Sequence, residues 1–517
     1  MSRPPLSELD GTEYEVIVIG AGAVGCASAR QLAGRGFRTL LIDRGDIGAG
    51  TSSRSSRMLY SGLGYLAARY PLWQMPFRPA DMLRRLLYTR EVMRCRAELV
   101  HDMPGHLTKH RFHYPFRNGD RYPPWLVDLG FRLVEALDGW RVPLAYRRLP
   151  PAKAAGESAM AAALGGPLRG VGVFEEYMYA WPERICVDTA LDAERRGARI
   201  RTYAEVVAIR RKGEGWLVTL DERAPGMQGR AQVRARLVVN AAGPWIDRVP
   251  GGGGESGRRR VIGIKGVNVM VRLPEAFRGQ GLEAFSSKGE PYYVFPWRDF
   301  HFIGPTETEV TGNPDDIRVE DAEIAYILAE ANNLFPTLRL TRADVLHCWC
   351  GVRPTSSRDG RTTSLPVEVA EDPARPGLLA VTGSTIMLHR HAARKVARRV
   401  EKRLGKRGPA PTGIIPAPES RDEGIGQMAA REHVVRLSDL IRRRLPDGLG
   451  PDLGRDRAEE LSHIAAASLG WSEARRHEEL QHFEVDTAQI YRQLQNAGPD
   501  AISLARRARS LQAERIA

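Results

Sequence analysis

Apolar positions fall into short runs at the start of the chain. Tyr14 to Gly20 (YEVIVIG) is largely apolar and β-branched, which predicts a parallel strand buried on both faces. The small residues of CASARQLAGRG at 26–36 predict a helix packed closely on that strand, and RTLLI at 38–42 predicts a second strand. The pattern therefore indicates a βαβ unit of about 30 residues.

The α/β pattern continues to about residue 406 and then changes. Periodicity predicts helices at 79–103, 184–200, 320–334 and 390–404, strands at 199–209 and 378–381, further strands between 261 and 305, and a hairpin of 216–220 with 233–240. We expect a flexible tail at 1–13 and a Pro- and Gly-rich linker at 407–426. Only helical periodicity remains at 427–517, with helix starts at Ser472 and near Pro499, which predicts a helical C-terminal domain.

The first strand leads directly into the motif Gly20-x-Gly22-x-x-Gly25. In such a motif the first glycine permits a tight turn, the second lets the backbone approach a pyrophosphate, and the third lets helix and strand pack closely. The helix N-terminus then offers N–H groups to the phosphates. Asp43 ends the second strand, where a carboxylate can accept hydrogen bonds from ribose hydroxyls. A glycine-rich packing turn explains the glycines but not Asp43, so the motif predicts dinucleotide binding.

The segment after Asp43 distinguishes FAD from NAD. It reads RGDIGAGTSSRSSRMLYSGLGYL, with many glycines and hydroxyl side chains and few apolar positions. Such a stretch forms neither a strand nor a buried helix for most of its length. Its backbone N–H groups and hydroxyls can line a phosphate and a flavin ring. The alternative is an ordinary solvated loop, but its position directly after the ribose-binding acid favours FAD.

Composition narrows the class of protein further. The 517 residues suffice for two or three domains, and the formal net charge is +14. The arginines are spread along the chain, which argues against nucleic acid as a partner. Five scattered cysteines form no disulfide framework, and the lone CxC of Cys348 and Cys350 is too little for a metal site, so no metal is expected. The chain lacks a long apolar run and an N-terminal signal pattern, so we expect a cytoplasmic protein.

Several motifs in order along the chain resemble the FAD-dependent glycerol-3-phosphate dehydrogenase family, within the D-amino-acid-oxidase-like group of flavoproteins. They are TSSRSSRMLYSGLGY at 51–65, NAAGPW at 240–245, IKG at 264–266, FPW at 295–297, IGPTE at 303–307, GVRP at 351–354 and LGWS at 469–472. The resemblance implies an α/β FAD-binding Rossmann-like domain with an inserted mixed-sheet substrate domain, plus a C-terminal all-α domain. The oxidoreductase region would span 14–406, with FAD-binding segments at about 14–75, 184–250 and 345–406 and substrate-domain segments at about 76–183 and 260–345.

The resemblance also implies the cofactor-binding residues. Gly20, Gly22, Gly25, Asp43 and the adjacent Arg44 would hold the ADP half of FAD; Thr51, Ser52, Ser53 and Arg57 would approach the pyrophosphate and ring; Val206 would contact adenine; Ala242 and Gly243 would close the site; and Gly383 and Thr385 would lie at the pyrimidine edge of the flavin. Backbone N–H groups at that edge would stabilise the negative charge of reduced flavin.

The expected substrate side departs from the family pattern. Arg353 stands where the family has a substrate-binding arginine, and the family's acid is kept as Glu307. A family histidine is Tyr60 and an arginine is Gly64; another histidine is Asn268, and a lysine is Thr385. We take Arg353, Tyr60, Asn268 and Glu307 as the candidate catalytic residues. Because cationic contacts to phosphate are lost, we expect glycerol 3-phosphate to be a poor substrate.

Structural roles compete with some of these assignments. Arg353 could brace a strand end, and Tyr60 and Tyr65 could be packing aromatics. His347, His389 and His391 lie near predicted site strands as candidates for a general base, but a structural or solvated role explains each of them as well.

The sequence thus predicts an FAD-dependent enzyme that transfers hydride from a hydroxyl-bearing carbon of a polyol phosphate or related anionic alcohol to flavin N5. One alternative is an amine or amino-acid oxidase on the same scaffold, and another is an FAD-binding protein with degraded catalysis and a regulatory role. The electron acceptor, quinone or oxygen, and a homodimer stay open as hypotheses. The basic amphipathic stretch Arg84 to Arg96 is either a solvated helix face or a contact with anionic lipid, which would put the protein at the inner face of the membrane.

Overall fold

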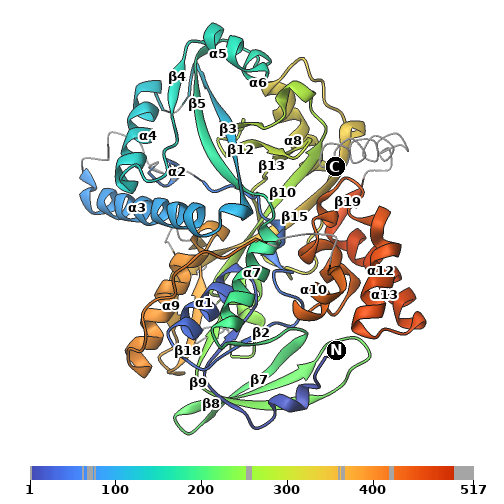
Figure 1. The fold of residues 1–517 in the computed structure, drawn as a ribbon. Helices are drawn as coiled ribbons and strands as arrows, with labels where there is room; N and C mark the ends of the chain where they lie inside the picture. Colours follow the sequence, from blue (N-terminus) through green and yellow to red (C-terminus); the bar gives the residue numbers. More distant parts are fainter. Residues whose placement is uncertain are drawn as a thin grey trace.

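Two β-sheets stacked end to end, with helices at the sides, organise the chain (Figure 1). The computed structural model describes residues 3–60, 63–66, 74, 77–120, 122–251, 259–358, 361–362, 367–417 and 424–493. These described residues form one eight-stranded and one eleven-stranded sheet. The α/β architecture with a second mixed sheet and a C-terminal helical region confirms the predicted fold class.

The first sheet carries the glycine motif at its centre. Its strands run in the order β17-β18-β9-β1-β2-β6, with β8 paired to β9 and β7 to β8. β1 pairs in parallel with both β2 and β9, as the buried apolar run predicts. The strands are β1 Glu13–Ile19, β2 Thr39–Ile42, β6 Arg199–Arg201, β7 Ala204–Lys212, β8 Gly215–Glu222, β9 Arg230–Asn240, β17 Glu368–Glu371 and β18 Leu378–Thr382.

Alternate residues of β1 pack into two different hydrophobic layers. Val16 and Val18 belong to a core shared with α1 Ala23–Gly34, α7 Pro182–Arg195 and α9 His389–Leu404. Ile17 and Ile19 belong to a second core with the β7–β8 hairpin. Because successive strand residues point to opposite faces, a strand covered on both sides needs an unbroken apolar run.

The second sheet is mixed and larger. Its order is β16-β15-β10-β13-β12-β11-β3-β5-β4, with β14 added to β10 and β19 to β15. The strands are β3 Leu107–Arg117, β4 Arg147–Leu149, β5 Leu168–Tyr179, β10 Val261–Val271, β11 Gln280–Phe285, β12 Pro291–Trp297, β13 Phe300–Gly304, β14 Thr308–Val310, β15 Val345–Arg358, β16 Arg361–Thr362 and β19 Tyr491–Gln493. The helices of this part are α2 Leu63–Leu66, α3 Pro79–Asp102, α4 Pro124–Asp138, α5 Pro151–Glu157, α6 Ala159–Ala162 and α8 Asp321–Leu334.

The structure corrects four sequence-based expectations. The predicted flexible tail is packed from residue 3 onward, because Leu6 and Leu9 are buried in the core behind the first sheet. The predicted strand 199–209 is two strands, β6 and β7, separated at Tyr203 by a positive φ of 50°. β15, expected in the FAD-binding part, pairs with β10 along its length and so belongs to the second sheet. The C-terminal region is not purely helical, since β19 adds to β15.

The described part of the predicted linker, up to residue 417, packs against the rest of the protein. Residues 405–417 form no helix or strand, but Ile415 is buried and donates its backbone N–H to the Asp102 carbonyl at 2.8 Å. The 418–423 part of the linker and the helix start near Pro499 lie outside the described residues.

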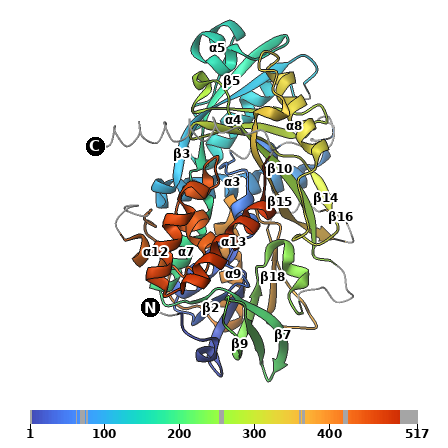
Figure 2. The same cartoon turned by 90° about the vertical axis from the view of Figure 1, so that its right-hand side faces the viewer.

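The C-terminal region contains α10 Ile425–Arg431, α11 Leu437–Asp439, a π-helical turn Leu440–Arg444, α12 Ala458–Leu469 and α13 Glu473–Ile490. Ser472 caps α13 by accepting from Arg475 N, which confirms the predicted start. These helices have a core of their own and lie beside α7 (Figure 2).

A buried ion cluster fastens this region to the first sheet. Both carboxylate oxygens of Asp46, three residues after Asp43, accept from Arg444 at 2.6 and 2.7 Å, and Arg443 also donates to Asp46. Arg443 donates further to Asp439 at 2.6 Å. Burial by itself would raise the pKa of Asp46, but the Arg444 and Arg443 guanidinium groups outweigh it and lower that pKa. The loop after Asp43 is therefore held by charges from the far end of the chain.

We predict that Asp46→Ala lowers the free energy of unfolding by about 3–5 kcal/mol, because it removes the carboxylate that two buried guanidinium groups share. Urea unfolding followed by circular dichroism measures the change. Asp221→Ala is the matched control, since Asp221 pairs with Arg230 on the surface and its loss should leave the midpoint nearly unchanged. Equal midpoints for the two variants would contradict this role of Asp46.

Candidate active site

A cavity of about 1340 Å³ opens where the two sheets meet. The structure brings nearly all of the predicted site residues to its wall. Its lining includes Gly20, Gly22, Asp43, Arg44, Thr51, Ser52, Arg57, Tyr60, Val206, Ala242, Gly243, Asn268, Glu307, Arg353, Gly383 and Thr385. Of the predicted set, Gly25 and Ser53 do not line it.

The glycine motif closes one wall of the cavity by tight backbone packing. Gly20 has a φ of +98°, and a Cβ on it would lie 2.8 Å from the Ala241 carbonyl oxygen. A Cβ on Gly25 would lie 1.7 Å from the Gly20 carbonyl oxygen. Gly25 is therefore required for helix–strand packing rather than for contact with a ligand, in agreement with the role of a third motif glycine.

The N-terminus of α1 faces the cavity through Gly22, Ala23 and Val24. Ser52 lies against it and accepts from Ala23 N at 3.0 Å. The helix dipole and the N–H groups of this first turn are suited to bind an anion such as the pyrophosphate of a dinucleotide.

Asp43 lies at the end of β2 with its carboxylate on the cavity wall. Its Oδ2 accepts from Ala21 N at 2.6 Å and its Oδ1 from Gly45 N at 2.8 Å. Burial raises the pKa of this carboxyl, and the two backbone donors counteract part of that rise. Each carboxylate oxygen has a second lone pair, so Asp43 can still accept from ribose hydroxyls.

The end of the cavity near Arg44 and Trp245 carries a cluster that the sequence did not reveal. Asp315, on the loop before α8, accepts from Arg44 Nη2 and from Trp245 Nε1, both at 2.9 Å. The Arg44 guanidinium also lies 5.2 Å from the centre of the Trp245 ring. Arg44 thus reaches the cavity as part of this cluster, and Asp315, in a polar loop without a motif, gave no signal. Val206 lines the same end from β7, beside Ala204 and Glu205.

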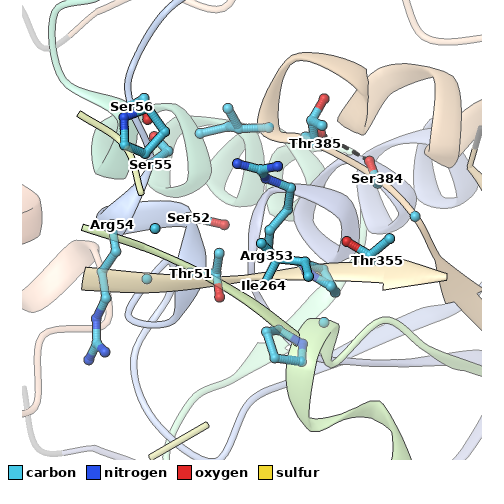
Figure 3. A pocket seen from close by; sticks show the side chains of 18 of the residues that line it. Thr51, Ser52, Arg54, Ser55, Ser56, Ile264, Arg353, Thr355, Ser384 and Thr385 are labelled. Carbon is cyan, nitrogen blue, oxygen red and sulfur yellow. Dashed lines mark hydrogen bonds between the residues drawn. The ribbon is translucent and has the colours of Figure 1, made fainter. Parts of the chain in front are cut away.

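The segment 51–57 forms the wall opposite Ser384 and Thr385 (Figure 3). Thr51 Oγ1 donates to the Val352 carbonyl at 2.9 Å, which ties the segment to β15. Ser53 donates to the Gly50 carbonyl at 2.9 Å and so turns away from the cavity, contrary to its predicted cofactor role.

Arg57, predicted to approach the pyrophosphate and ring, lines the cavity, while its guanidinium is engaged by other protein groups. Its guanidinium stacks over the Trp297 ring, with its carbon 4.2 Å from the ring centre, and lies 4.0 Å from Glu183. The side chain is therefore a buried brace between segments, and the φ of 60° at this residue marks the sharp bend of the chain here.

Ala242 and Gly243, predicted to close the dinucleotide site, line the cavity directly after β9. Asn240 fixes this turn, since its Oδ1 accepts from Ala242 N at 3.2 Å and its Nδ2 donates to the Ile246 carbonyl at 2.9 Å. Gly383, with a φ of +73°, makes the corresponding turn after β18, ahead of Thr385 and the start of α9.

Arg353 reaches the cavity from β15 and extends between the Ser55–Ser56 and Ser384–Thr385 segments, whereas Arg54 points the other way (Figure 3). Its Nη1 donates to Glu307 Oε1 at 2.9 Å, so the two predicted residues form an ion pair at the cavity wall. Asn268, on β10, is buried, and no described residue donates to its Oδ1. An unpaired buried amide oxygen beside a cavity suits a polar ligand atom.

Tyrosines, and no described histidine, line the same part of the cavity. Tyr60 packs edge-on against Tyr65 and Tyr293, with ring centres 5.8 and 6.4 Å apart. Tyr293 was missed, although alternation along β12 places it on the same face as Phe295 of the FPW motif. His347, His389 and His391 lie outside the cavity lining, which removes them as candidate bases. Within the described residues, no group of three His, Cys, Asp or Glu side chains could hold a metal ion.

These features define a flavin-type dinucleotide-binding oxidoreductase. The motif turn, the helix N-terminus, Asp43 and the hydroxyl-rich segment fit FAD along one cavity, with polar groups left unpaired at its far end. The family of FAD-dependent oxidoreductases (DAO) matches residues 15–399, and the chain belongs to this family.

Relatives and solved structures agree with this assignment. The chain is 29% identical over 494 residues to a glycerol-3-phosphate dehydrogenase of Synechocystis sp., covering 89% of this chain and 85% of that protein. It is 31% identical over 421 residues to D-erythritol 1-phosphate dehydrogenase of Brucella abortus, covering 78% and 77%. A glycerol-3-phosphate dehydrogenase from Bacillus halodurans, solved with FAD, shares the fold with a TM-score of 0.71 at 20% identity, covering 93% and 96% of the chains. The protein is thus an FAD-dependent oxidoreductase.

We expect FAD to be bound without a covalent link, because residues 51–58 contain no Cys or His to attach it. Asp43→Ala should weaken FAD binding by about 1.5–3 kcal/mol, the scale of a hydrogen bond to a charged group. Flavin fluorescence on titration of FAD into apoprotein measures this. Asp10→Ala is the control, since Asp10 also accepts a backbone N–H, from Gln232, but outside the cavity. Unchanged affinity in Asp43→Ala would remove Asp43 from the FAD site.

Proposed function

We propose that this protein oxidises a hydroxyl-bearing carbon of a polyol phosphate or a related anionic alcohol. The observation that carries the proposal is the Arg353 guanidinium, which extends into the FAD cavity opposite Ser384 and Thr385 (Figure 3). A guanidinium group can bind phosphate or carboxylate through two parallel hydrogen bonds. Relatives named for glycerol 3-phosphate and D-erythritol 1-phosphate support a phosphorylated polyol.

The residues around Arg353 have distinct roles in this proposal. Bound FAD supplies the acceptor of the hydride. Arg353 holds the anionic end of the substrate, and Glu307 keeps its guanidinium in one orientation through their ion pair. The Asn268 amide can hydrogen-bond a substrate hydroxyl but cannot serve as a base. Backbone N–H groups of the Gly383–Thr385 turn are suited to stabilise negative charge at the pyrimidine edge of the flavin.

The pocket favours a substrate other than glycerol 3-phosphate. Gly64 and Thr385 provide no cation, and a Cβ on Gly64 would lie 2.4 Å from Tyr60 Oη. An arginine at position 64 is therefore excluded while Tyr60 holds its place. The exposed cations Arg84 and Lys288 line the same cavity and could meet the phosphate of a longer polyol.

We predict that glycerol 3-phosphate reduces the flavin poorly, whereas a four-carbon or longer polyol phosphate reduces it readily. A phosphate dianion buried without enough paired charge is costly, and Arg353 is already shared with Glu307. Anaerobic bleaching of the flavin absorbance across a panel of polyol phosphates, free polyols and amino acids measures this. Rapid bleaching by sub-millimolar glycerol 3-phosphate would contradict the altered specificity, and bleaching by amino acids alone would favour the amine-oxidase alternative.

Arg353→Lys should raise KM about tenfold or more with the preferred substrate, because an ammonium keeps the charge but loses the planar pair of donors. Arg353→Ala should raise it further. Steady-state kinetics of both variants measure the effect, with Arg230→Lys as the control, since Arg230 pairs with Asp221 on the surface and lies outside the cavity lining. An unchanged KM in Arg353→Ala would make the arginine a structural brace only.

We further propose that the protein lies on the membrane surface through α3 and α4, which lie together on the side away from the C-terminal helices (Figure 1). Trp125, Leu129 and Leu133 form an exposed stripe at helical spacing on α4, with Trp125 63% exposed. Leu83 and Leu87 are exposed on α3 near Arg84 and Arg90. Exposed apolar residues among arginines suit an anionic lipid surface.

Within the predicted basic stretch, Arg96 does not contribute to such a surface, because it is fully buried against Glu176. No helix of the described residues is long and apolar enough to cross a membrane. Quinone in the same bilayer would then be the electron acceptor, with oxygen as the alternative. Whether the protein forms a homodimer is a separate question, which light scattering on the purified protein tests.

We predict that the protein sediments with vesicles of anionic lipid. The double variant Trp125→Ser with Leu129→Ser should lower the bound fraction at least tenfold, because burial of each apolar side chain in the lipid contributes about 1.5–3 kcal/mol of binding free energy. Val485→Ser, at an exposed apolar position on α13, is the control. Equal sedimentation of all variants, or none by the wild type, would rule out this surface.

A further inference from the structure

The Tyr60 hydroxyl is held between a donor and a carboxylate. Its Oη accepts the Gly64 N–H at 2.8 Å and donates to Glu283 Oε1 at 3.3 Å. The ring lines the cavity and packs edge-on against Tyr65, which lies next to Arg353 and Thr385. Tyr60 thus places a hydroxyl at the substrate end of the cavity and directs its proton toward Glu283.

Glu283 is a buried acid that the polyol oxidation as described so far does not use. It lies on β11, paired across the sheet with Tyr293 of β12. The groups that face it are Tyr60, Tyr293, Tyr114 and a second buried acid, Glu176, which pairs with Arg96 at 2.7 Å. The pKa of Glu283 is raised to about 8, mainly by burial; the Tyr60 hydrogen bond opposes this rise and the charge of Glu176 adds to it.

Oxidation of an alcohol requires a proton acceptor as well as a hydride acceptor. The hydroxyl proton must leave as the carbonyl forms, and a side chain usually takes it. No described histidine lines the cavity, and the Glu307 carboxylate is engaged by Arg353 at 2.9 Å. Among the described residues of this wall, Tyr60 joins the cavity to a carboxylate that lies outside it.

We propose that Tyr60 is the catalytic residue that takes the hydroxyl proton of the substrate, while it passes its own proton to Glu283. The inference rests on the proposed oxidation of an alcohol. The substrate O–H bond breaks as a new Tyr60 O–H bond forms, and the original Tyr60 O–H bond breaks as the Glu283 carboxylate becomes a carboxylic acid. The C–H bond breaks with its two electrons leaving as hydride to FAD, so the alcohol becomes a carbonyl. Glu283 acts through Tyr60 as a positioning and proton-accepting residue.

The arrangement fixes a pH dependence. Glu283 accepts a proton only when it is ionised, which is the form present above its raised pKa of about 8. The rate of flavin reduction should therefore rise with pH, with a midpoint near pH 8, and level off well above it. Glu283→Gln should abolish this rise.

The first test is anaerobic stopped-flow reduction of the flavin in wild type, Tyr60→Phe and Glu283→Gln. We expect Tyr60→Phe to slow reduction about 10²- to 10⁴-fold at pH 8, the usual contribution of a positioned acid–base group, with little change in substrate KM. Tyr88→Phe is the matched control, because Tyr88 also lines the cavity and contacts Tyr65, at 5.1 Å between ring centres. It should keep the rate and pH profile of wild type. A wild-type rate and profile in Tyr60→Phe would overturn the proposal.

The second test needs no substrate and separates this proposal from the proposed function. Infrared difference spectroscopy of the FAD-bound protein follows the carboxylic acid C=O band as the pH is raised. We expect a band that disappears with a midpoint near pH 8, is missing in Glu283→Gln and moves to higher pH in Tyr60→Phe, which loses the hydrogen bond that lowers this pKa. If no alcohol on the panel bleaches the flavin, the proposed function fails. The infrared band still decides whether Glu283 can act as a proton acceptor beside Tyr60. A Glu283 band that persists far above pH 8 would overturn the proposal, because Glu283 would then already carry a proton when the substrate must lose its own.

Discussion

Close backbone packing around Gly20 is the constraint on which the site depends. A side chain at Gly20 would meet the Ala241 carbonyl, and one at Gly25 would meet Gly20 itself. Because β1, α1 and the turn after β9 approach so closely, the N-terminus of α1 and the end of β2 open into the same space. That geometry presents the helix N–H groups and Asp43 together, as dinucleotide binding requires. An L-residue at either glycine would separate these parts before any contact with FAD were lost.

The second sheet completes the cavity through a few specific links. β15 places Arg353 on the wall, and Thr51 joins the hydroxyl-rich segment to the same strand through the Val352 carbonyl. Leu59 N donates to the Tyr177 carbonyl of β5 at 2.8 Å, which fixes the start of the tyrosine cluster. The chain segment that contains Thr51 and Leu59 is thus hydrogen-bonded to the second sheet while it follows directly from the first. The Asp46–Arg444 ion pairs connect the same part of the chain to the C-terminal helices.

The sequence predicted the parts whose function needs a local pattern. The βαβ unit, Asp43 and most wall residues followed from glycine spacing, apolar runs and family motifs. It did not predict the direction of long side chains, because Arg57 and Arg44 find partners from distant segments, Trp297 and Asp315. Leu6 and Leu9 looked like part of a tail because two apolar residues show no periodicity, although the fold buries both. Glu283 could not be predicted as a site residue for a similar reason, because a single buried acid on a strand has no sequence pattern. Its candidate role depends on the hydrogen bond from Tyr60, which lies more than 200 residues away in the chain.

The central claim is that one cavity holds FAD against the glycine turn and a phosphorylated alcohol beneath Arg353. A crystal structure of the purified protein, soaked with the polyol phosphate that bleaches it best, tests this most directly. The account predicts FAD with its ribose on Asp43, its pyrophosphate at the start of α1 and its ring between segments 51–57 and 383–385, and the substrate phosphate on the Arg353 guanidinium with a hydroxyl at Tyr60. FAD in another orientation, or a substrate that contacts neither Arg353 nor Tyr60, would contradict it.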